Sequence, residues 1–322
     1  MTVSAAQRPH PRITVLHGDH LPTRLDLGEP RLASNADELA KALPGTEVLL
    51  VWDFTSDAVR DAWPAADSAL RWVHTASAGV DRVIFPGIVE SSVTVTNSRG
   101  VFDIPMAEYV LGLVLAMAKD LPRTLALQAE HEWRHRETES IAGRTAVVVG
   151  SGPIGRAIAR LLEAAGMRVE LVGRRRAAGR HGMDDLPALL PTSDWLVLAA
   201  PLTDATRGML DATAIAALPT TARVINVGRG ALVVEGDLVE ALHAGRIAGA
   251  ALDVFEHEPL TPASPLWDVP GLIISPHMSG DLVGWRDSLA ELFADNLARY
   301  VTGKPLRNVV DKKLGYVPEG TP

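Results

Sequence analysis

The sequence predicts an α/β protein made of two Rossmann-like domains, each a doubly wound parallel sheet covered by helices. Short β-branched runs alternate with helical stretches along the chain, a pattern typical of buried parallel strands. The chain has 322 residues, more than a single hydrophobic core usually serves. A glycine-rich turn, Gly150–Gly155, lies between one such run and a helix, where nucleotide-binding sheets carry it.

The first hundred residues contain four candidate strands, and a helix with an apolar stripe follows them. This helix includes Met106–Met117, with Asp103 and Pro105 as start signals and Pro122 as a stop signal. A similar apolar stripe near the end of the chain covers Leu289–Tyr300. The four candidate strands are 13–16, 48–51, 70–73 and 93–95.

The region between the two helices contains six more candidate strands separated by helical spacers, as expected for a doubly wound sheet. One domain is therefore inserted into the other. We assign residues 100–282 to a dinucleotide-binding domain, and residues 1–99 and 283–322 to a substrate-binding, catalytic domain. The six strands are 145–149, 168–172, 195–199, 223–226, 249–252 and 272–275.

The composition is that of an ordinary globular protein, with 47% hydrophobic and 22% charged residues. A net charge of −8 argues against a broad nucleic-acid surface. The absence of cysteine excludes disulfides and cysteine-ligated metals. The longest apolar run, Tyr109–Ala118, is too short for the roughly 20 residues that span a bilayer. Because the N-terminus also lacks the apolar segment of a secretory signal, we expect a cytoplasmic protein without a membrane partner.

The glycine-rich turn predicts dinucleotide binding because each glycine has a physical task. Gly150 makes the tight turn, Gly152 lets the backbone approach a pyrophosphate, and Gly155 allows close packing of helix and strand. The start of the following helix, with Pro153 and Ile154, presents a partial positive charge to the phosphates. We assign all five residues to cofactor binding.

The end of the next strand indicates which nicotinamide cofactor is preferred. An NAD site usually has an acid here that binds the ribose hydroxyls. In this chain Gly173 and a run of arginines follow the strand, so we expect Arg174 and Arg175 to pair with the 2′-phosphate of NADPH. The alternative interpretation is a solvated basic loop.

Polar residues just beyond three later strands are candidates for the reaction, because ligands gather at the carboxyl ends of parallel strands. Arg229 offers a planar fork for a substrate carboxylate. His277 is a candidate proton donor, which the reduction of a carbonyl needs. Glu258 or Glu256 could stabilise the protonated imidazole, and the residues alone do not choose between them. The spacing suits no metal site, and we expect none.

Six ordered blocks of sequence extend this pattern over nearly the whole chain. They are Thr75–Asp81, Asn97–Gly100 leading to Ala107–Glu108, Gly150–Gly155, Asn226–Gly230, Leu252–Phe255 leading to Glu258–Pro259, and Ser275–His277. Together they resemble the D-isomer-specific 2-hydroxyacid dehydrogenase family. The spacing of the three reacting residues is similar to that of NADPH-dependent glyoxylate/hydroxypyruvate reductases.

The resemblance implies that Arg229, Glu258 and His277 form the Arg–Glu–His set of the family. It favours Glu258 over Glu256, because the acid of the family directly precedes a proline.

The resemblance also implies further contacts with substrate and cofactor. The backbone of Ala78 and Gly79 would provide a second clamp on the substrate carboxylate, and Arg174 matches an arginine of NADP-using relatives. Asp253 would contact the nicotinamide carboxamide. The other residues implied to line the cofactor are Pro201, Thr206, Val227, Gly228 and Gly280.

Trp133 lies where related reductases carry an aromatic residue that reaches the active site of the partner subunit. The resemblance therefore implies a homodimer and a substrate contact for Trp133. A buried interface tryptophan without a catalytic part is the alternative.

The resulting hypothesis is an NADPH-preferring reductase of a small 2-oxo acid such as glyoxylate or hydroxypyruvate. One alternative is the same chemistry on a phosphonate-bearing or aromatic 2-oxo acid. The motifs do not identify the side chains that contact the end of the substrate away from its carboxylate, for which the candidates are Trp52, Phe102, Trp133 and Trp285. The other alternative is a non-catalytic, corepressor-like module that senses NAD(P). The Arg–Glu–His set disfavours it, since a sensor needs no proton donor.

Overall fold

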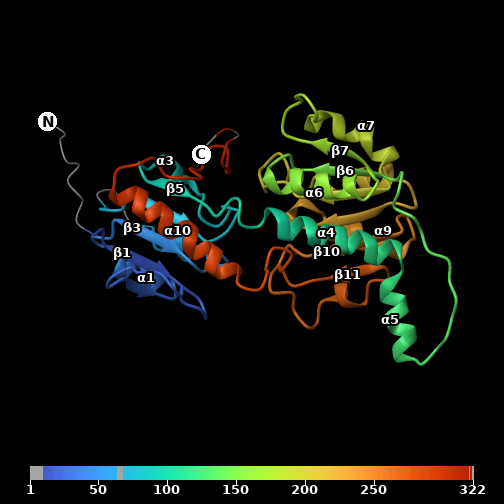
Figure 1. Cartoon of the computed structure of the whole chain (residues 1–322), viewed down its shortest axis with the longest axis horizontal. Coiled ribbons are helices and arrows are strands. Elements are labelled where there is room, and N and C mark those ends of the chain that lie inside the picture. Colours follow the sequence, from blue (N-terminus) through green and yellow to red (C-terminus); the bar gives the residue numbers. More distant parts are fainter. Residues whose placement is uncertain (1–9, 64–67, 319, 321–322) are drawn as a thin grey trace. The chain divides into compact units, whose positions relative to one another are not determined.

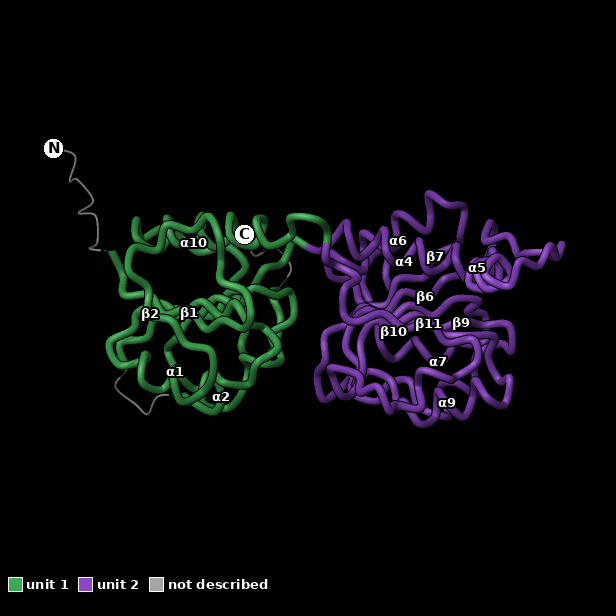
Figure 2. Tube along the Cα trace, turned by 90° about the horizontal axis from the view of Figure 1, so that it is seen from below, with its two compact units in different colours: residues 1–101, 282–322 green, residues 102–281 purple. Residues whose placement is uncertain are grey.

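The computed structural model describes residues 10–63, 68–318 and 320. The chain divides into two compact units (Figure 2). Unit 1 comprises residues 1–101 and 282–322, and unit 2 comprises residues 102–281. Each unit is built on a parallel sheet, which confirms the predicted fold class.

The sheet of unit 1 has five strands among the described residues, in the order β2-β1-β3-β4-β5. Helix α10 (Trp285–Val301) covers one face, whereas α1 (Ala36–Ala42) and α2 (Ala58–Asp61) cover the other (Figures 1 and 2). The C-terminal helix completes the core of the N-terminal sheet, because Trp72 stacks on Phe293 and Tyr300. The other elements are β1 (Ile13–Leu16), β2 (Arg31–Ala33), β3 (Val48–Val51), β4 (Trp72–Thr75), β5 (Thr94–Thr96) and α3 (Pro86–Glu90).

The predicted strands of unit 1 agree with the structure at β1 and β3, whereas β4 and β5 begin and end slightly later than predicted. β4 starts at Trp72 because that residue pairs with Val48 of β3. The sequence did not predict β2, since this three-residue edge strand has two exposed residues and no apolar run.

The sheet of unit 2 has six strands among the described residues, in the order β11-β10-β9-β8-β6-β7, all parallel. All six were predicted, and two end one residue earlier than expected. The strands are β6 (Thr145–Val149), β7 (Arg168–Val172), β8 (Trp195–Leu198), β9 (Arg223–Asn226), β10 (Gly249–Leu252) and β11 (Leu272–Ile274). The α-helices are α4 (Asp103–Ala118), α5 (Leu121–Ala129), α6 (Pro153–Ala164), α7 (Leu186–Leu189), α8 (Ala212–Ala217) and α9 (Glu235–His243).

Helices on both faces bury this sheet. Figure 2 shows α4 and α6 on one side and α7 and α9 on the other. Because side chains alternate along a strand, Val147 and Val149 of β6 belong to the core under α9, whereas Ala146 and Val148 pack with α4 and α6. Burial on both faces explains the nearly continuous apolar runs of the sequence.

The predicted long helix is α4, which ends at Ala118. Pro122 acts differently from the prediction, because it lies in the first turn of a second helix, α5, where its missing N–H has no cost. Between the two helices the chain turns at Asp120, with φ of 49°. Over the described part of the chain, the helices are too short or too polar to cross a membrane.

Candidate active site

The glycine turn follows β6 and precedes α6, where the strand order of unit 2 reverses. Two glycines have no room for a side chain. A Cβ on Gly155 would lie 1.6 Å from the Gly150 carbonyl oxygen, and one on Gly150 would lie 2.4 Å from a backbone oxygen after β8. In contrast, a Cβ on Gly152 would meet nothing within 4 Å, and no side chain caps the helix there. With Pro153 and half-buried Ile154 opening the helix, this turn fits the pyrophosphate of a dinucleotide.

The basic loop after β7, residues 173–182, contains no acidic residue that could bind the hydroxyls of a ribose. The strand ends at Val172, and the exposed Arg174 and Arg175 follow it closely. The acid of this strand, Glu170, lies before its end, and its Oε2 is 2.7 Å from Nε2 of His181. The charged residues that directly follow β7 are therefore basic and not acidic.

The loops after β8 and β9 are held by internal hydrogen bonds and close packing. The hydroxyl of buried Thr206 donates to the Pro201 carbonyl (2.8 Å), and it accepts from the Thr203 N–H (2.9 Å). Val227 is buried, and a Cβ on Gly228 would lie 3.0 Å from a backbone oxygen. These segments therefore present a fixed backbone at the edge of the sheet that bears the glycine turn.

Arg229 lies in the tight loop after β9. The Asn226 side chain holds this loop, because its amide donates to the Arg229 carbonyl (2.9 Å) and its oxygen accepts from the Gly228 N–H (3.0 Å). A Cβ on Gly230 would lie 1.9 Å from the Phe255 carbonyl carbon, so only glycine fits there. The half-buried Arg229 guanidinium donates to the Gly228 carbonyl (2.8 Å).

His277 and Glu258 form a pair in unit 2. Nδ1 of His277 lies 2.7 Å from Oε2 of Glu258, whose other oxygen accepts from the Phe255 N–H (2.9 Å). Burial alone would raise the pKa of the Glu258 carboxyl. Hydrogen bonds from His277 and Phe255, together with the charges of His277 and Arg229, outweigh this effect. The pKa of Glu258 is therefore held below its usual range. Glu258 is thus an ionised carboxylate beside the imidazole. Since Nδ1 faces this carboxylate, Nε2 is the ring nitrogen suited to proton transfer.

Glu256 was the other acid considered as the partner of His277, but its contacts are with Glu235. Its N–H donates to the Glu235 carboxylate (2.6 Å), and the Glu235 N–H lies 3.4 Å from the Glu256 carboxylate. Burial raises the pKa of the Glu235 carboxyl. The structure therefore brings Glu258, and not Glu256, to His277.

Asp253 has contacts that the sequence reasoning missed. It is fully buried, and its carboxylate accepts from the Ser275 hydroxyl (2.6 Å) and from the N–H groups of Met278 and Ser279 (both 2.9 Å). Its carbonyl accepts from the His277 N–H (2.8 Å). Both carboxylate oxygens thus hold the loop that carries His277, which has a left-handed φ of 52°. An acid directly after a buried strand was the available signal, but the sequence does not show which loop it bonds.

Ala78 and Gly79 lie in the turn after β4 of unit 1. The side-chain amide of Asn97 donates to the Ala78 carbonyl (2.5 Å), and the Ser77 hydroxyl donates to the Gly79 carbonyl (2.6 Å). These bonds fix the backbone of the predicted carboxylate clamp. On β4 itself, burial lowers the pKa of His74 to about 3, so this histidine is a neutral core residue.

The remaining candidates differ in exposure. Trp133, in the segment after α5, is fully exposed. Trp52 and Phe102 are buried, and a Cβ on Gly280 would lie 2.7 Å from the Phe102 ring. Of these residues, only Trp133 offers a large apolar surface.

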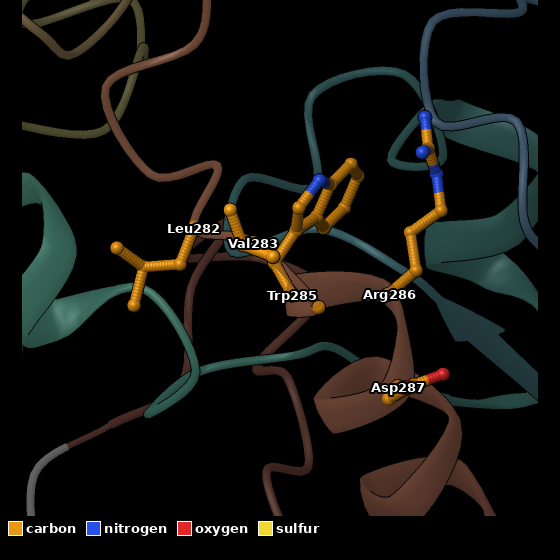
Figure 3. A pocket seen from close by; sticks show the side chains of 6 residues that line it. Leu282, Val283, Trp285, Arg286 and Asp287 are labelled. Atoms are coloured by element: carbon orange, nitrogen blue, oxygen red, sulfur yellow. The ribbon is translucent and has the colours of Figure 1, made fainter.

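A pocket opens in unit 1 at the start of α10, lined by residues 282–287 (Figure 3). Trp285 and Arg286 extend from the first turn in the same direction, and the guanidinium carbon lies 4.8 Å from the ring centre. The Trp285 ring also makes a T-shaped contact with the Phe54 ring. The ring and the cation therefore pack against each other at the start of the helix.

Comparison with known proteins identifies the family of the chain. Residues 111–279 match the family model of the D-isomer specific 2-hydroxyacid dehydrogenase NAD binding domain, so unit 2 is an NAD(P)-binding domain of an oxidoreductase. This match covers more than half of the chain. The chain belongs to the D-isomer specific 2-hydroxyacid dehydrogenase family.

Several relatives resemble the chain. Glyoxylate/hydroxypyruvate reductase A of Arabidopsis thaliana is 33% identical over 74% of this chain and 77% of its own length. D-3-phosphoglycerate dehydrogenase of Methanocaldococcus jannaschii is 30% identical over 92% of this chain, which spans only 58% of that protein. The NADPH-dependent glyoxylate/hydroxypyruvate reductase of Sinorhizobium meliloti, solved with NADP and sulfate, is 29% identical with a TM-score of 0.80 over 95% of this chain and 100% of that one.

Proposed function

We propose that the chain is an NADPH-dependent reductase that converts a small 2-oxo acid, glyoxylate or hydroxypyruvate, to the 2-hydroxy acid, with the D configuration where the product is chiral. The observation that carries the proposal is the 2.7 Å contact between His277 and ionised Glu258 in a unit that binds NAD(P). Two relatives named for this activity, one plant and one bacterial, support the substrate class.

Each reacting residue has a distinct task in this proposal. Bound NADPH supplies the hydride. Arg229 binds the carboxylate of the 2-oxo acid with a bidentate fork, and the amides of Ala78 and Gly79 contribute a second clamp. His277 delivers a proton from Nε2 to the carbonyl oxygen, and Glu258 stabilises the imidazolium before that transfer. Holding the acid by its carboxylate orients its carbonyl carbon, which is what a hydride acceptor requires.

The preference for NADPH is part of the proposal. Arg174 and Arg175 lie just after β7, where an NAD site would have an acid, and guanidinium groups favour a 2′-phosphate. Solved relatives from Sinorhizobium meliloti and Xanthobacter autotrophicus were bound to NADP and NADPH. The cofactor-lining roles of Pro201, Thr206, Val227, Gly228, Asp253 and Gly280 belong to the same proposal.

We further propose that unit 2 is the dinucleotide domain and unit 1 the substrate domain of a cytoplasmic homodimer. Exposed Leu121 and Leu125 on α5, with Trp133 beyond it, support a subunit interface in this region. Trp133 would then contact the substrate bound by the partner subunit or pack in the interface.

The test is NADPH oxidation, followed at 340 nm, with glyoxylate, hydroxypyruvate and larger 2-oxo acids including phosphonate-bearing and aromatic ones. We expect turnover with the two small acids. The glycerate formed from hydroxypyruvate should have the D configuration, whereas the glycolate formed from glyoxylate has no stereocentre. Turnover only with a larger acid would overturn the proposed substrate. Binding of NADPH without turnover of any acid would favour the corepressor-like module.

A further inference from the structure

The basic loop after β7 folds back onto the strand that precedes it. The Gly173 N–H donates to the His181 carbonyl (2.9 Å), and the His181 N–H donates to the Leu171 carbonyl (2.8 Å). A tight turn closes the loop, with two bonds between Ala177 and Arg180. The fold thereby returns Arg180 to the end of β7, although it lies well beyond the arginine run in sequence.

The side chain of Arg180 reaches the glycine turn. Its Nη1 lies 3.2 Å from the hydroxyl oxygen of Ser151, the residue between the first two glycines of that turn. A Cβ on Gly173 would lie 3.1 Å from Cδ of Arg180 and 2.4 Å from the Ser151 hydroxyl oxygen. The side chains of Arg180 and Ser151 therefore contact each other beside Gly173. This point lies between the glycine turn, which fits a pyrophosphate, and the end of β7.

This point is where a dinucleotide places its adenosine ribose, because the ribose lies between the glycine turn and the end of the second strand. Arg174 and Arg175 lie on the exposed side of the loop, whereas Arg180 is half-buried and its Nε is shielded from solvent. An arginine already held in place loses less side-chain freedom on binding a phosphate.

Neighbouring contacts anchor the loop independently of any ligand. Nε2 of His181 lies 2.7 Å from the Glu170 carboxylate. The Asp185 carboxylate accepts from the Gly182 N–H (2.8 Å) and from Arg176 (2.5 Å). Arg176 therefore bonds Asp185 and helps to hold the loop.

We propose that Arg180, with Ser151 as its hydrogen-bonding neighbour, is the principal residue that distinguishes NADPH from NADH in this protein. The proposal rests on the NADPH preference proposed above, and it adds a residue outside the arginine run. Its guanidinium forms charge-assisted bonds with the 2′-phosphate, which NADH lacks.

The experiment measures the dissociation constants of NADP⁺ and NAD⁺ by isothermal titration calorimetry, so it does not depend on turnover. We expect Arg180→Ala to weaken NADP⁺ about 10- to 100-fold, as for the loss of a charged hydrogen bond, and to change NAD⁺ by less than about 3-fold. Arg180→Lys should restore part of the loss. The matched control, Arg176→Ala, removes the same charge from the same loop and should change the NADP⁺/NAD⁺ ratio far less.

Two outcomes overturn the proposal while leaving the proposed function intact. Equal weakening of NADP⁺ and NAD⁺ by Arg180→Ala would assign the residue to the pyrophosphate or to loop structure. Equal effects of Arg176→Ala and Arg180→Ala on the ratio would assign the preference to the general charge of the loop. A different result, equal binding of NADP⁺ and NAD⁺ by the wild-type protein, would contradict the proposed preference for NADPH itself.

Discussion

Replacing His74 should change how the stability of unit 1 depends on pH. This histidine lies in β4 with no measurable exposure, and its Nδ1 is 2.8 Å from the Thr96 hydroxyl oxygen. Burial lowers the pKa of His74 from 6.5 to about 3. Because the unfolded chain binds this proton more readily than the folded chain, stability is complete above about pH 6.5 and falls as the pH decreases toward about 3.

The size of the effect follows from that difference. Between pH 7.5 and pH 5 the unfolded state gains nearly one proton at His74, whereas the folded state gains almost none. At 1.36 kcal/mol per pH unit, the free energy of unfolding falls by about 2 kcal/mol. For a unit of this size, that corresponds to a decrease in Tm of about 4 to 8 °C.

The assay compares Tm values of the wild type and of His74→Gln at several pH values between 5 and 7.5. His74→Gln should lower stability at neutral pH and remove this part of the acid sensitivity, whereas His20→Gln, at an exposed position, should leave the pH dependence unchanged. Parallel pH profiles for the wild type and His74→Gln would refute the reasoning. Taking differences between variants removes the contribution of every other group that titrates in the same range.

Further predictions concern the reacting residues and the cofactor. His277→Ala should lower kcat about 10²- to 10⁴-fold with little change in cofactor affinity, and wild-type turnover would remove it from proton transfer. Glu258→Gln should lower kcat markedly, while Glu256→Gln, its matched control, should not; equal losses would contradict the assigned pair. Asp253→Ala should reduce both Tm and kcat, since the His277 loop loses three hydrogen bonds, and an unchanged Tm would contradict that role. Arg174→Ala should raise the KM for NADPH less than Arg180→Ala does, and a larger increase would make Arg174 the principal phosphate ligand.

The sequence predicted most of the strands because burial on both faces imposes continuous apolar runs. β6, β7, β9 and β10 were predicted with their observed bounds. The short edge strand β2 carries no such run, and its pairing with β1 is a property of the assembled sheet. The sequence did not predict the helix that begins near Pro122. A proline can lie in the first turn of a helix or just beyond the end of one, and the sequence alone does not distinguish these two positions.

Long-range contacts set the limits of prediction at the candidate site. The glycine turn is local, so its tasks followed from the residues alone. The contact of Arg180 with Ser151 depends on a loop that folds back, and no periodicity indicates where such a loop returns. Likewise, the choice between Glu258 and Glu256 needed the family resemblance, because both acids lie in the same loop and only the fold turns one of them toward His277.

The arrangement of the reacting residues follows from strand order rather than from their spacing in sequence. β9, β10 and β11 are adjacent and parallel, so the loops after them, with Arg229, Glu258 and His277, leave the same edge of the sheet. Buried polar side chains at the strand ends then fix these loops: Asn226 holds the one with Arg229, and Asp253 holds the one with His277. A buried carboxylate or amide that lost its partners would be costly, so each anchor restricts its loop to a narrow set of conformations. The same hydrogen bonds that stabilise unit 2 thereby hold the imidazole and the guanidinium in place, and stability and chemistry depend on the same few buried groups.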